Sequence, residues 1–255
     1  MQQIQKYLED FRKISLDKID SIKLMKRHDM KYVFHKDKLQ SIFNYLYNDY
    51  QVLEIERNIT FRYDNLYYDT DDYFFYYQHH NQKLNRYKLR CRRYNETKNC
   101  YFEIKFKTNK SKTIKTRILL NNKEINNELP KEAKEFARKT IAVNNGKIID
   151  RVSPALWVGF NRITFANLIN KERLTFDMNL TYTDKTSNTN KINNLIIAEL
   201  KSDKISINSP FSKFLKGLNI SPSNFSKYSM GIAITEKDIK SNRFKEKLKK
   251  LKTLI

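Results

Sequence analysis

Glycine, proline and cysteine are scarce in this chain. Its 255 residues include only four glycines, four prolines and two cysteines. Neither G-x-x-x-x-G-K-[ST] nor G-x-G-x-x-G occurs, which excludes a P-loop ATPase and a Rossmann dinucleotide site. Cys91 and Cys100 cannot build a disulfide framework, and their spacing to the histidines is unlike that of a zinc site. We therefore expect both to be buried, reduced thiols.

Long apolar runs are also missing. No stretch of about 18 apolar residues occurs, so we expect no helix that crosses a bilayer. Residues 1–10 lack the apolar segment of a secretory signal. From these two absences we expect a cytoplasmic protein.

Positive charge, by contrast, is in large excess. Fifty lysines and arginines against 28 aspartates and glutamates give a formal net charge of +22 at pH 7. Such an excess indicates a polyanionic partner, which is nucleic acid, an anionic membrane or a phosphate-rich small molecule. Because 40% of the residues are hydrophobic and 13% aromatic, the chain is not a disordered basic tail.

Helical periodicity is present in four segments. Apolar residues recur three and four positions apart over about 3–14, 38–47 and 130–143. The tail at 236–255 is basic and carries an apolar stripe at helical spacing. We predict a single domain over 1–235, with an N-terminal helix at about 3–14, a helical insertion at about 130–145 and a basic helical tail at 236–255.

Elsewhere the period is two, and cations occupy the polar positions. Between 86 and 92, Arg86, Lys88, Arg90 and Arg92 alternate with apolar residues. About eight such strands are predicted. They lie near 27–34, 58–68, 86–92, 102–107, 114–118, 160–165, 173–179 and 198–201.

Two architectures fit these strands. An open antiparallel sheet would cover its apolar face with helices and expose its charges to water. A closed barrel would instead turn the charged faces inward and carry the helices outside. Four cations on one face of one strand repel each other unless anions lie among them, which favours an interior that binds several phosphates. Acidic residues on the same faces, Asp29, Glu103, Asp177 and Glu199, are suitable ligands for a hard divalent ion.

A set of motifs in one order resembles a known family. The motifs are RHDMKY at 27–32, YYDT at 67–70, KLRCRRY at 88–94, EIKFK at 103–107, FNR at 160–162, RLTFD at 173–177, AELK at 198–201 and SKY at 226–228. Together they resemble the vacuolar transporter chaperone (VTC) domain, from about Lys26 to Gly231. This resemblance implies the triphosphate tunnel metalloenzyme superfamily. Its fold is an α+β domain with a closed antiparallel eight-stranded β tunnel, a charged lumen and helices packed outside.

The resemblance also implies an activity and a site. Members of the VTC branch are phosphotransferases that make polyphosphate from ATP, so ATP and polyphosphate are the expected partners. Carried over by motif, the phosphate-binding and catalytic residues are Lys31, Arg90, Arg92, Lys105, Arg162, Arg173, Ser226 and Lys227. Lys115, Arg117 and Lys201 are further candidates for phosphate binding. Glu199 is the implied ligand for Mn²⁺ or Mg²⁺.

Other functions stay open from the sequence. A tripolyphosphate or nucleoside-triphosphate hydrolase of the same superfamily typically has E-x-E-x-K in its first strand, where this chain has Arg27-x-Asp29-x-Lys31. A non-catalytic barrel would bind any polyanion in a salt-dependent way without turnover. We expect no specific nucleic-acid partner. The lysine-rich face of the tail is suited to weak contact with an anionic membrane or with polyphosphate. Replacing Arg90 by alanine is expected to abolish triphosphate turnover and to leave the fold intact.

Overall fold

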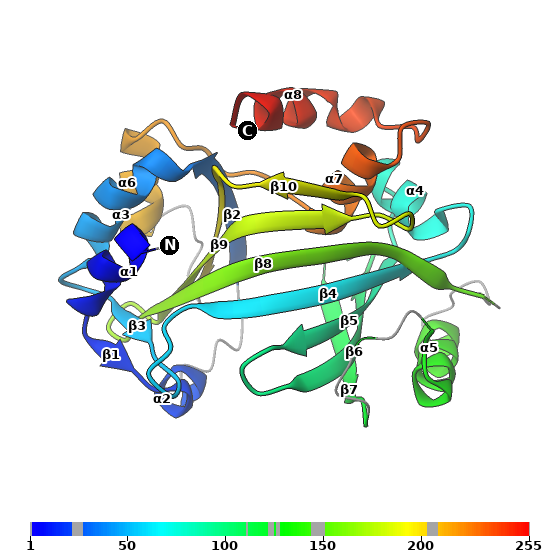
Figure 1. Cartoon of the computed structure of the whole chain (residues 1–255), viewed down its shortest axis with the longest axis horizontal. Coiled ribbons are helices and arrows are strands. Elements are labelled where there is room, and N and C mark those ends of the chain that lie inside the picture. Colours follow the sequence, from blue (N-terminus) through cyan, green and yellow to red (C-terminus); the bar gives the residue numbers. More distant parts are fainter. Residues whose placement is uncertain are drawn as a thin grey trace.

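A computed structural model describes residues 2–21, 28–110, 112–121, 125, 128–143, 151–202 and 209–254 (Figure 1). Arg27 of the first motif and Ile255 at the end of the tail lie outside these residues. The helices are α1 (Gln2–Glu9), α2 (Leu16–Ser21), α3 (Leu39–Leu46), α4 (Phe74–His80), α5 (Lys131–Val143), α6 (Pro210–Gly217), α7 (Lys227–Thr235) and α8 (Lys245–Leu254), with 3₁₀ turns η1 (Lys36–Lys38) and η3 (Asn242–Phe244). The strands are β1 (Lys13–Ile14), β2 (His28–His35), β3 (Gln51–Leu53), β4 (Phe61–Asp69), β5 (Arg86–Tyr94), β6 (Asn99–Lys107), β7 (Thr113–Leu119), β8 (Ser153–Asn167), β9 (Glu172–Thr183), β10 (Thr189–Ile192) and β11 (Leu195–Ser202).

The strands form one large, strongly curled sheet. Within the described chain it has 11 strands, and its main path runs β2-β11-β9-β8-β4-β5-β6-β7, with antiparallel pairing throughout that path. Lys31 on β2 nevertheless lies close enough to Lys88 on β5 to lower its pKa. In a flat sheet these strands would be five spacings, about 24 Å, apart. The sheet therefore curves around an interior face that carries both lysines.

The prediction of a closed eight-stranded barrel is wrong. The eight predicted strands do form the main path, but in the described residues β2 and β7 are its two ends and do not pair with each other. The free side of β2 is occupied by the segment that leads into α7: Tyr32 bridges to Pro222, and the amide of Ser223 donates to the carbonyl of Lys31 at 2.7 Å. At the other end, β7 is largely exposed and carries Lys115 and Arg117, charges that discourage edge pairing.

The outer face of the sheet is apolar and covered by helices. Figure 1 shows α1, α3 and α6 together at one end of the sheet and α5 at the other. At the first end, Phe11 just after α1, Phe43 of α3 and Phe211 of α6 pack on Phe165 and Phe176 of the sheet. Ala133, Ala137 and Ile141 of α5 belong to the cluster that includes Phe102 and Ile104 of β6. This arrangement leaves the charged side chains of alternate positions on the interior face.

Helix α7 lies on the interior side, near one end of the strands. Tyr228 stacks on Tyr67 of β4 with ring centroids 5.0 Å apart, and Met230 and Ile232 join a core cluster with Leu156 of β8. Asp69, at the end of β4, accepts hydrogen bonds from the amides of Phe75 and Tyr76 at the start of α4 and from the hydroxyl of Tyr228. These contacts fix the first turn of α7 over the interior face.

Gly231 allows this close approach. A Cβ added there would collide with Leu156 and Tyr182, whereas a Cβ at Gly217, the last residue of α6, meets nothing within 4 Å. We expect Gly231→Ala to lower the free energy of unfolding by about 1–3 kcal/mol, because the helix must move off the sheet. Urea denaturation measures this, with Gly217→Ala as the matched control. Equal stability of the two variants would contradict the packing described.

The predicted elements agree with the structure in type, and their bounds differ. The helices predicted at 38–47 and 130–143 are α3 and α5, and the tail contains α8. The N-terminal helix ends at Glu9 instead of residue 14, since Lys13 and Ile14 pair in parallel with β3. The short strands β1, β3 and β10 were not predicted.

Two further expectations concern single features. Cys91 and Cys100 are both buried and not joined in a disulfide. None of the helices in the described ranges is long and apolar enough to cross a membrane.

Candidate functional site

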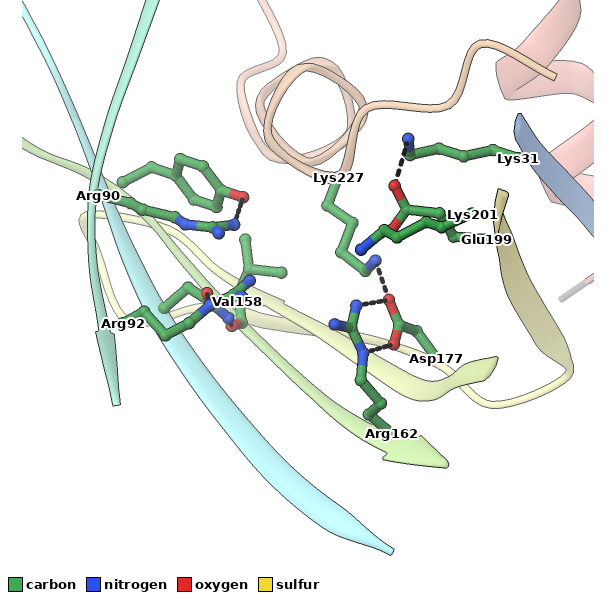
Figure 2. A network of polar contacts seen from close by, with 11 residues as sticks. Lys31, Arg90, Arg92, Val158, Arg162, Asp177, Glu199, Lys201 and Lys227 are labelled. Carbon is green, nitrogen blue, oxygen red and sulfur yellow. Dashed lines mark hydrogen bonds and ion pairs between the residues drawn. The ribbon is translucent and has the colours of Figure 1, made fainter. Parts of the chain in front are cut away.

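Two groups of charged side chains face each other on the interior face, below the start of α7 (Figure 2). The first lies on β5, β6 and β7. Arg90 donates from Nε and Nη2 to Oε2 of Glu103 at 2.8 and 2.6 Å, and Lys115 pairs with the other carboxylate oxygen. Glu103 is fully buried, which raises its pKa, but Arg90, Arg92 and Lys115 outweigh burial and hold the pKa below its usual value. Arg90 also donates to the hydroxyl of Tyr67 at 3.2 Å.

Arg92 is held differently from Arg90. Its Nε donates to the amide oxygen of Asn65 at 2.8 Å, and Asn65 donates in turn to the carbonyl of Val158 at 3.0 Å. Burial and the neighbouring Arg90 lower the pKa of Arg92. Its charge is therefore oriented by an amide and remains available to an anion.

The second group centres on Asp177 of β9. Arg162 of β8 binds this carboxylate through two hydrogen bonds, at 2.6 and 2.8 Å, and Lys227 from the first turn of α7 binds the same carboxylate (Figure 2). Burial raises the pKa of Asp177, but Arg162 and Lys227 lower it to about 2. The carboxylate stays ionised and ties α7 to the sheet.

Glu199 of β11 lies between two lysines. Lys31 of β2 contacts Oε1 at 3.0 Å, and Lys201 lies 3.7 Å from Oε2. Burial raises the pKa of Glu199, but Lys201, Lys31 and Arg162 keep it well below its usual value. Burial also lowers the pKa of Lys201, to about 8.

Two further lysines of the interior face form no ion pair with a carboxylate in the described part of the chain. Lys88 of β5 is half-buried and surrounded by Arg86, Lys31, Arg90 and Lys107, and desolvation and these charges lower its pKa to about 7. The pKa of Lys105 on β6 is also well below its usual value, chiefly because of Arg90 and then of burial. Neighbouring positive charges and burial thus disfavour the protonated form of these lysines. A bound multivalent anion would relieve this repulsion, so the site is preorganised for one.

Ser226 links Lys88 to α7. It is the N-cap of the helix, where its Oγ accepts from the amide of Ser229 at 3.3 Å and from Nζ of Lys88 at 2.8 Å. The beginning of α7 thus faces the interior with Ser226 and Lys227 side by side in sequence, and a helix N-terminus favours bound phosphate.

The structure brings together most of the residues that the resemblance implied. The ones that share the interior face are Lys31, Arg90, Arg92, Lys105, Lys115, Arg162, Glu199, Lys201, Ser226 and Lys227 (Figure 2). Arg173 is farther along β9, opposite Lys201, and its buried Nε has no hydrogen-bond partner in the described part of the chain. Arg117 lies at the margin: it is exposed, and its guanidinium carbon is 4.6 Å from the ring centre of Tyr101.

Several residues of this site were not predicted. Lys88 is not among the residues that the resemblance implied. It nevertheless alternates with apolar residues in the same way as Arg90 and Arg92, so the sequence pattern could have placed it in the site. Tyr67 and Asn65, which orient the two arginines, carry no such signal, because their roles depend on pairing between β4 and β5. Glu103 and Asp177 were considered as metal ligands, whereas both are enclosed by cations.

The donor set for a divalent ion is small. The described residues contain no group of three or more His, Cys, Asp or Glu side chains placed to hold a metal. Asp29, the fourth candidate carboxylate, is exposed on β2 opposite Lys201. Glu199 is more accessible than Glu103 and Asp177, and Thr175 pairs with it across β9 and β11 with a buried hydroxyl that lacks a hydrogen-bond partner among the described residues. One carboxylate and one hydroxyl fit Mg²⁺ or Mn²⁺ that arrives with most of its ligands as phosphate oxygens and water.

A hollow of about 310 Å³ lies elsewhere, on the outer face of the sheet. It is lined by Arg62, Asp64, Trp157, Gly159 and neighbours, and by none of the interior cations. Arg62 and Asp64 pair with each other there at 3.1 Å. Because phosphate would meet a balanced charge pair at this hollow, the interior face is the better anion site.

The curled antiparallel sheet with helices outside is shared with a solved structure. Among solved structures, a candidate adenylate cyclase from Bacillus halodurans shares this fold at 16% sequence identity with a TM-score of 0.51, over 78% of this chain and 92% of that one. Two weaker matches have TM-scores of 0.43. One is a candidate adenylate cyclase from Vibrio parahaemolyticus, at 12% identity over 81% of this chain and 97% of that one. The other is a candidate adenylyl cyclase from Hippeastrum with a dominant triphosphatase activity, at 13% identity over 80% of this chain and 93% of that one.

The family follows from the sequence match. The VTC domain model matches residues 26–236, so the chain belongs to the VTC domain family. A comparison with curated proteins gives no match. The family supports an enzyme related to polyphosphate or triphosphate chemistry.

Proposed function

We propose that the protein is a polyphosphate polymerase that transfers the γ-phosphoryl group of ATP to the end of a polyphosphate chain. ATP and polyphosphate are then its partners, and the cytoplasm is its proposed compartment. The interior cations would bind the phosphates of both substrates, with most of their charge not matched by carboxylates.

One observation carries the choice of transfer over hydrolysis. Three carboxylates of the interior, Glu103, Asp177 and Glu199, are each ion-paired with two cations and each have a lowered pKa. Carboxylates held in this way are poor general bases at neutral pH. Water needs a base or a positioning group to attack a phosphoryl group, whereas the terminal phosphate of a chain is already an anionic nucleophile. The interior therefore suits a phosphate acceptor better than water.

The proposed roles follow from position. Lys31, Lys105, Arg90 and Arg92 surround the place where phosphates would meet, and Arg162, Arg173 and Lys201 extend that surface along β8, β9 and β11. Ser226 would donate a hydrogen bond to a phosphate oxygen, with Lys227 beside it. In an in-line transfer, these groups would neutralise the charge that builds on the equatorial oxygens of the γ-phosphoryl group. No residue needs to form a covalent intermediate.

A divalent ion is part of the proposal. Glu199, with the hydroxyl of Thr175, would hold Mn²⁺ or Mg²⁺ bound mainly by substrate phosphates. When bound, the ion supplies charge neutralisation and alignment of the phosphate oxygens. Lys31 and Lys201 would then release Glu199 and turn to phosphate.

The test is purified protein with ATP and Mn²⁺, followed by ³¹P NMR and gel analysis for long chains. We expect internal chain phosphates to appear together with ADP. Glu199→Gln keeps the shape of the side chain and removes its charge, so it should abolish synthesis. Glu246→Gln, an exposed change on α8, is the matched control and should leave synthesis unchanged.

The other outcomes identify the alternatives. Orthophosphate and ADP without polymer would make the protein a hydrolase and contradict the proposal. No loss of ATP, with polyphosphate still bound, would make it a polyanion-binding protein.

A further inference from the structure

The interior face changes character along β4, β5 and β6. Toward α7 it carries Lys88 and Lys105, and away from α7 it carries tyrosines. Tyr63 of β4 pairs with Tyr94 of β5, and Arg92 pairs with Tyr101 of β6. At the strand ends farthest from α7, the proposed phosphate site therefore borders an aromatic surface. The proposed phosphate chemistry assigns no role to these tyrosines.

The rings of this surface contact one another and three arginines, of which Arg162 lies 5.0 Å from the ring centre of Tyr63. The ring centres of Tyr94 lie 5.1 Å from Tyr63 and 5.9 Å from Tyr101, both edge to face. The guanidinium carbon of Arg92 is 5.2 Å from the ring centre of Tyr63 and 6.0 Å from that of Tyr94. Arg117 lies over Tyr101 at 4.6 Å. Arg92 therefore belongs both to the cation row with Arg90 and to the aromatic surface.

The outermost part of this surface is open to solvent. Leu119 of β7 pairs with Tyr101 and is 57% exposed, and Arg117 is exposed while Tyr94 and Tyr101 are half-buried. Leu119 and the stacked pair of Arg117 and Tyr101 therefore do not serve to fill a hydrophobic core. Flat aromatic and guanidinium faces are the groups on which nucleobases stack in single-stranded nucleic-acid sites.

We propose that Tyr94, Tyr101, Arg117 and Leu119 form a nucleobase subsite. It takes the base of a nucleoside triphosphate whose phosphates extend past Arg92 toward Arg90 and Lys88. The inference rests on the proposed function and refines it, because it names the residues that contact the base of the nucleotide donor and predicts which bases they prefer. Since stacking reads the π-face of a base and not its edge, purine triphosphates should bind better than pyrimidine triphosphates, with little choice between adenine and guanine.

The experiment compares two ligands on the same protein at fixed salt. Dissociation constants are measured for the β,γ-imido analogue of ATP and for tripolyphosphate, which has no base. We expect Tyr101→Ala to weaken the analogue about tenfold, equivalent to about 1.4 kcal/mol, and tripolyphosphate by less than about twofold. Arg117→Lys keeps the charge and loses the planar face, so it should also weaken only the analogue.

Further variants guard against misfolding and general effects. Leu119→Ser changes an exposed side chain and should weaken the analogue selectively without affecting stability. Tyr45, half-buried on the outer side and stacked on Phe214 at 4.0 Å, provides the matched control, and Tyr45→Ala should change neither ligand. Equal losses for both ligands, or no loss in any of the three test variants, would overturn the subsite.

The subsite and the polymerase can fail separately. If the protein makes polyphosphate from ATP but the three variants keep the ratio of the two dissociation constants, the subsite is wrong and the polymerase stands. If the ratio changes as expected but no polymer forms, the subsite stands and the polymerase is wrong.

Discussion

Arg90→Ala should destabilise the protein by about 3–5 kcal/mol, the range observed when one partner of a buried ion pair is removed. The side chain of Glu103 is fully buried, and Arg90 provides two of its hydrogen bonds. In the variant, Lys115 remains on the other oxygen, but Oε2 of the buried carboxylate loses both of its hydrogen bonds from Arg90. The sequence alone suggested that a lumen charge contributes little to stability, and the buried pair reverses that expectation.

Urea denaturation of wild type and variants gives the measurement. Arg138→Ala on the exposed side of α5 is the matched control and should change stability by less than about 0.5 kcal/mol. Adding Glu103→Gln to Arg90→Ala removes the uncompensated charge and should recover part of the loss. A single Arg90→Ala variant as stable as wild type would show that Glu103 does not depend on this pair. Loss of turnover in Arg90→Ala must then be judged at a temperature where the variant is folded.

Alternation predicted the strands well because it is a local property. A strand with one face in an apolar core and the other among charges repeats every two residues, so β5, β6 and β7 are visible in the sequence. The same pattern assigned the cations to one face. Which strands become neighbours is not encoded in this pattern, so it could not show that residues 222 and 223 would occupy the free side of β2.

The partners of the charges were also beyond sequence reasoning. Asp177 is 15 positions from Arg162 and 50 from Lys227, and only the fold brings the three together. The N-terminal helix was predicted too long for a related reason. Ile14 continues the helical spacing of the apolar residues. Lys13 and Ile14 nevertheless pair with β3, and this tertiary interaction overrides the local helical preference.

Polyphosphate binding should weaken by at least about 100-fold between pH 6.5 and pH 9.5, because the interior lysines lose protons within that range. The pKa of Lys88 is about 7 and that of Lys201 about 8, and those of Lys105, Lys115 and Lys227 are also lowered. A bound polyanion favours the charged form of each lysine and raises its pKa. Binding therefore takes up protons above about pH 7, and affinity falls as pH rises.

Long-chain polyphosphate is the suitable probe, because its internal phosphates keep the same charge over this range and only the chain ends titrate. Lys88→Met removes the lysine with the pKa nearest neutrality, so it should weaken binding at pH 6.5 and flatten the dependence on pH. Lys213→Met, an exposed change on α6, should do neither. Affinity that stays constant or rises with pH would mean that the interior lysines do not bind the polymer.

The ligand-free protein should show the opposite sign. Lys88 and Lys201 have pKa values below that of free lysine, so between about pH 7 and pH 9.5 the unfolded chain binds more protons than the folded one. Their contribution to the free energy of unfolding therefore rises with pH in this window when no anion is present. With saturating polyphosphate the interior lysines stay protonated, as they do in the unfolded chain, so the shrinking binding contribution offsets this rise and the measured stability should change little with pH in this window. Thermal unfolding with and without the polymer at pH 6.5, 8 and 9.5 tests both trends on one protein. Parallel curves would contradict an interior whose lysines have lowered pKa values only when no anion is bound.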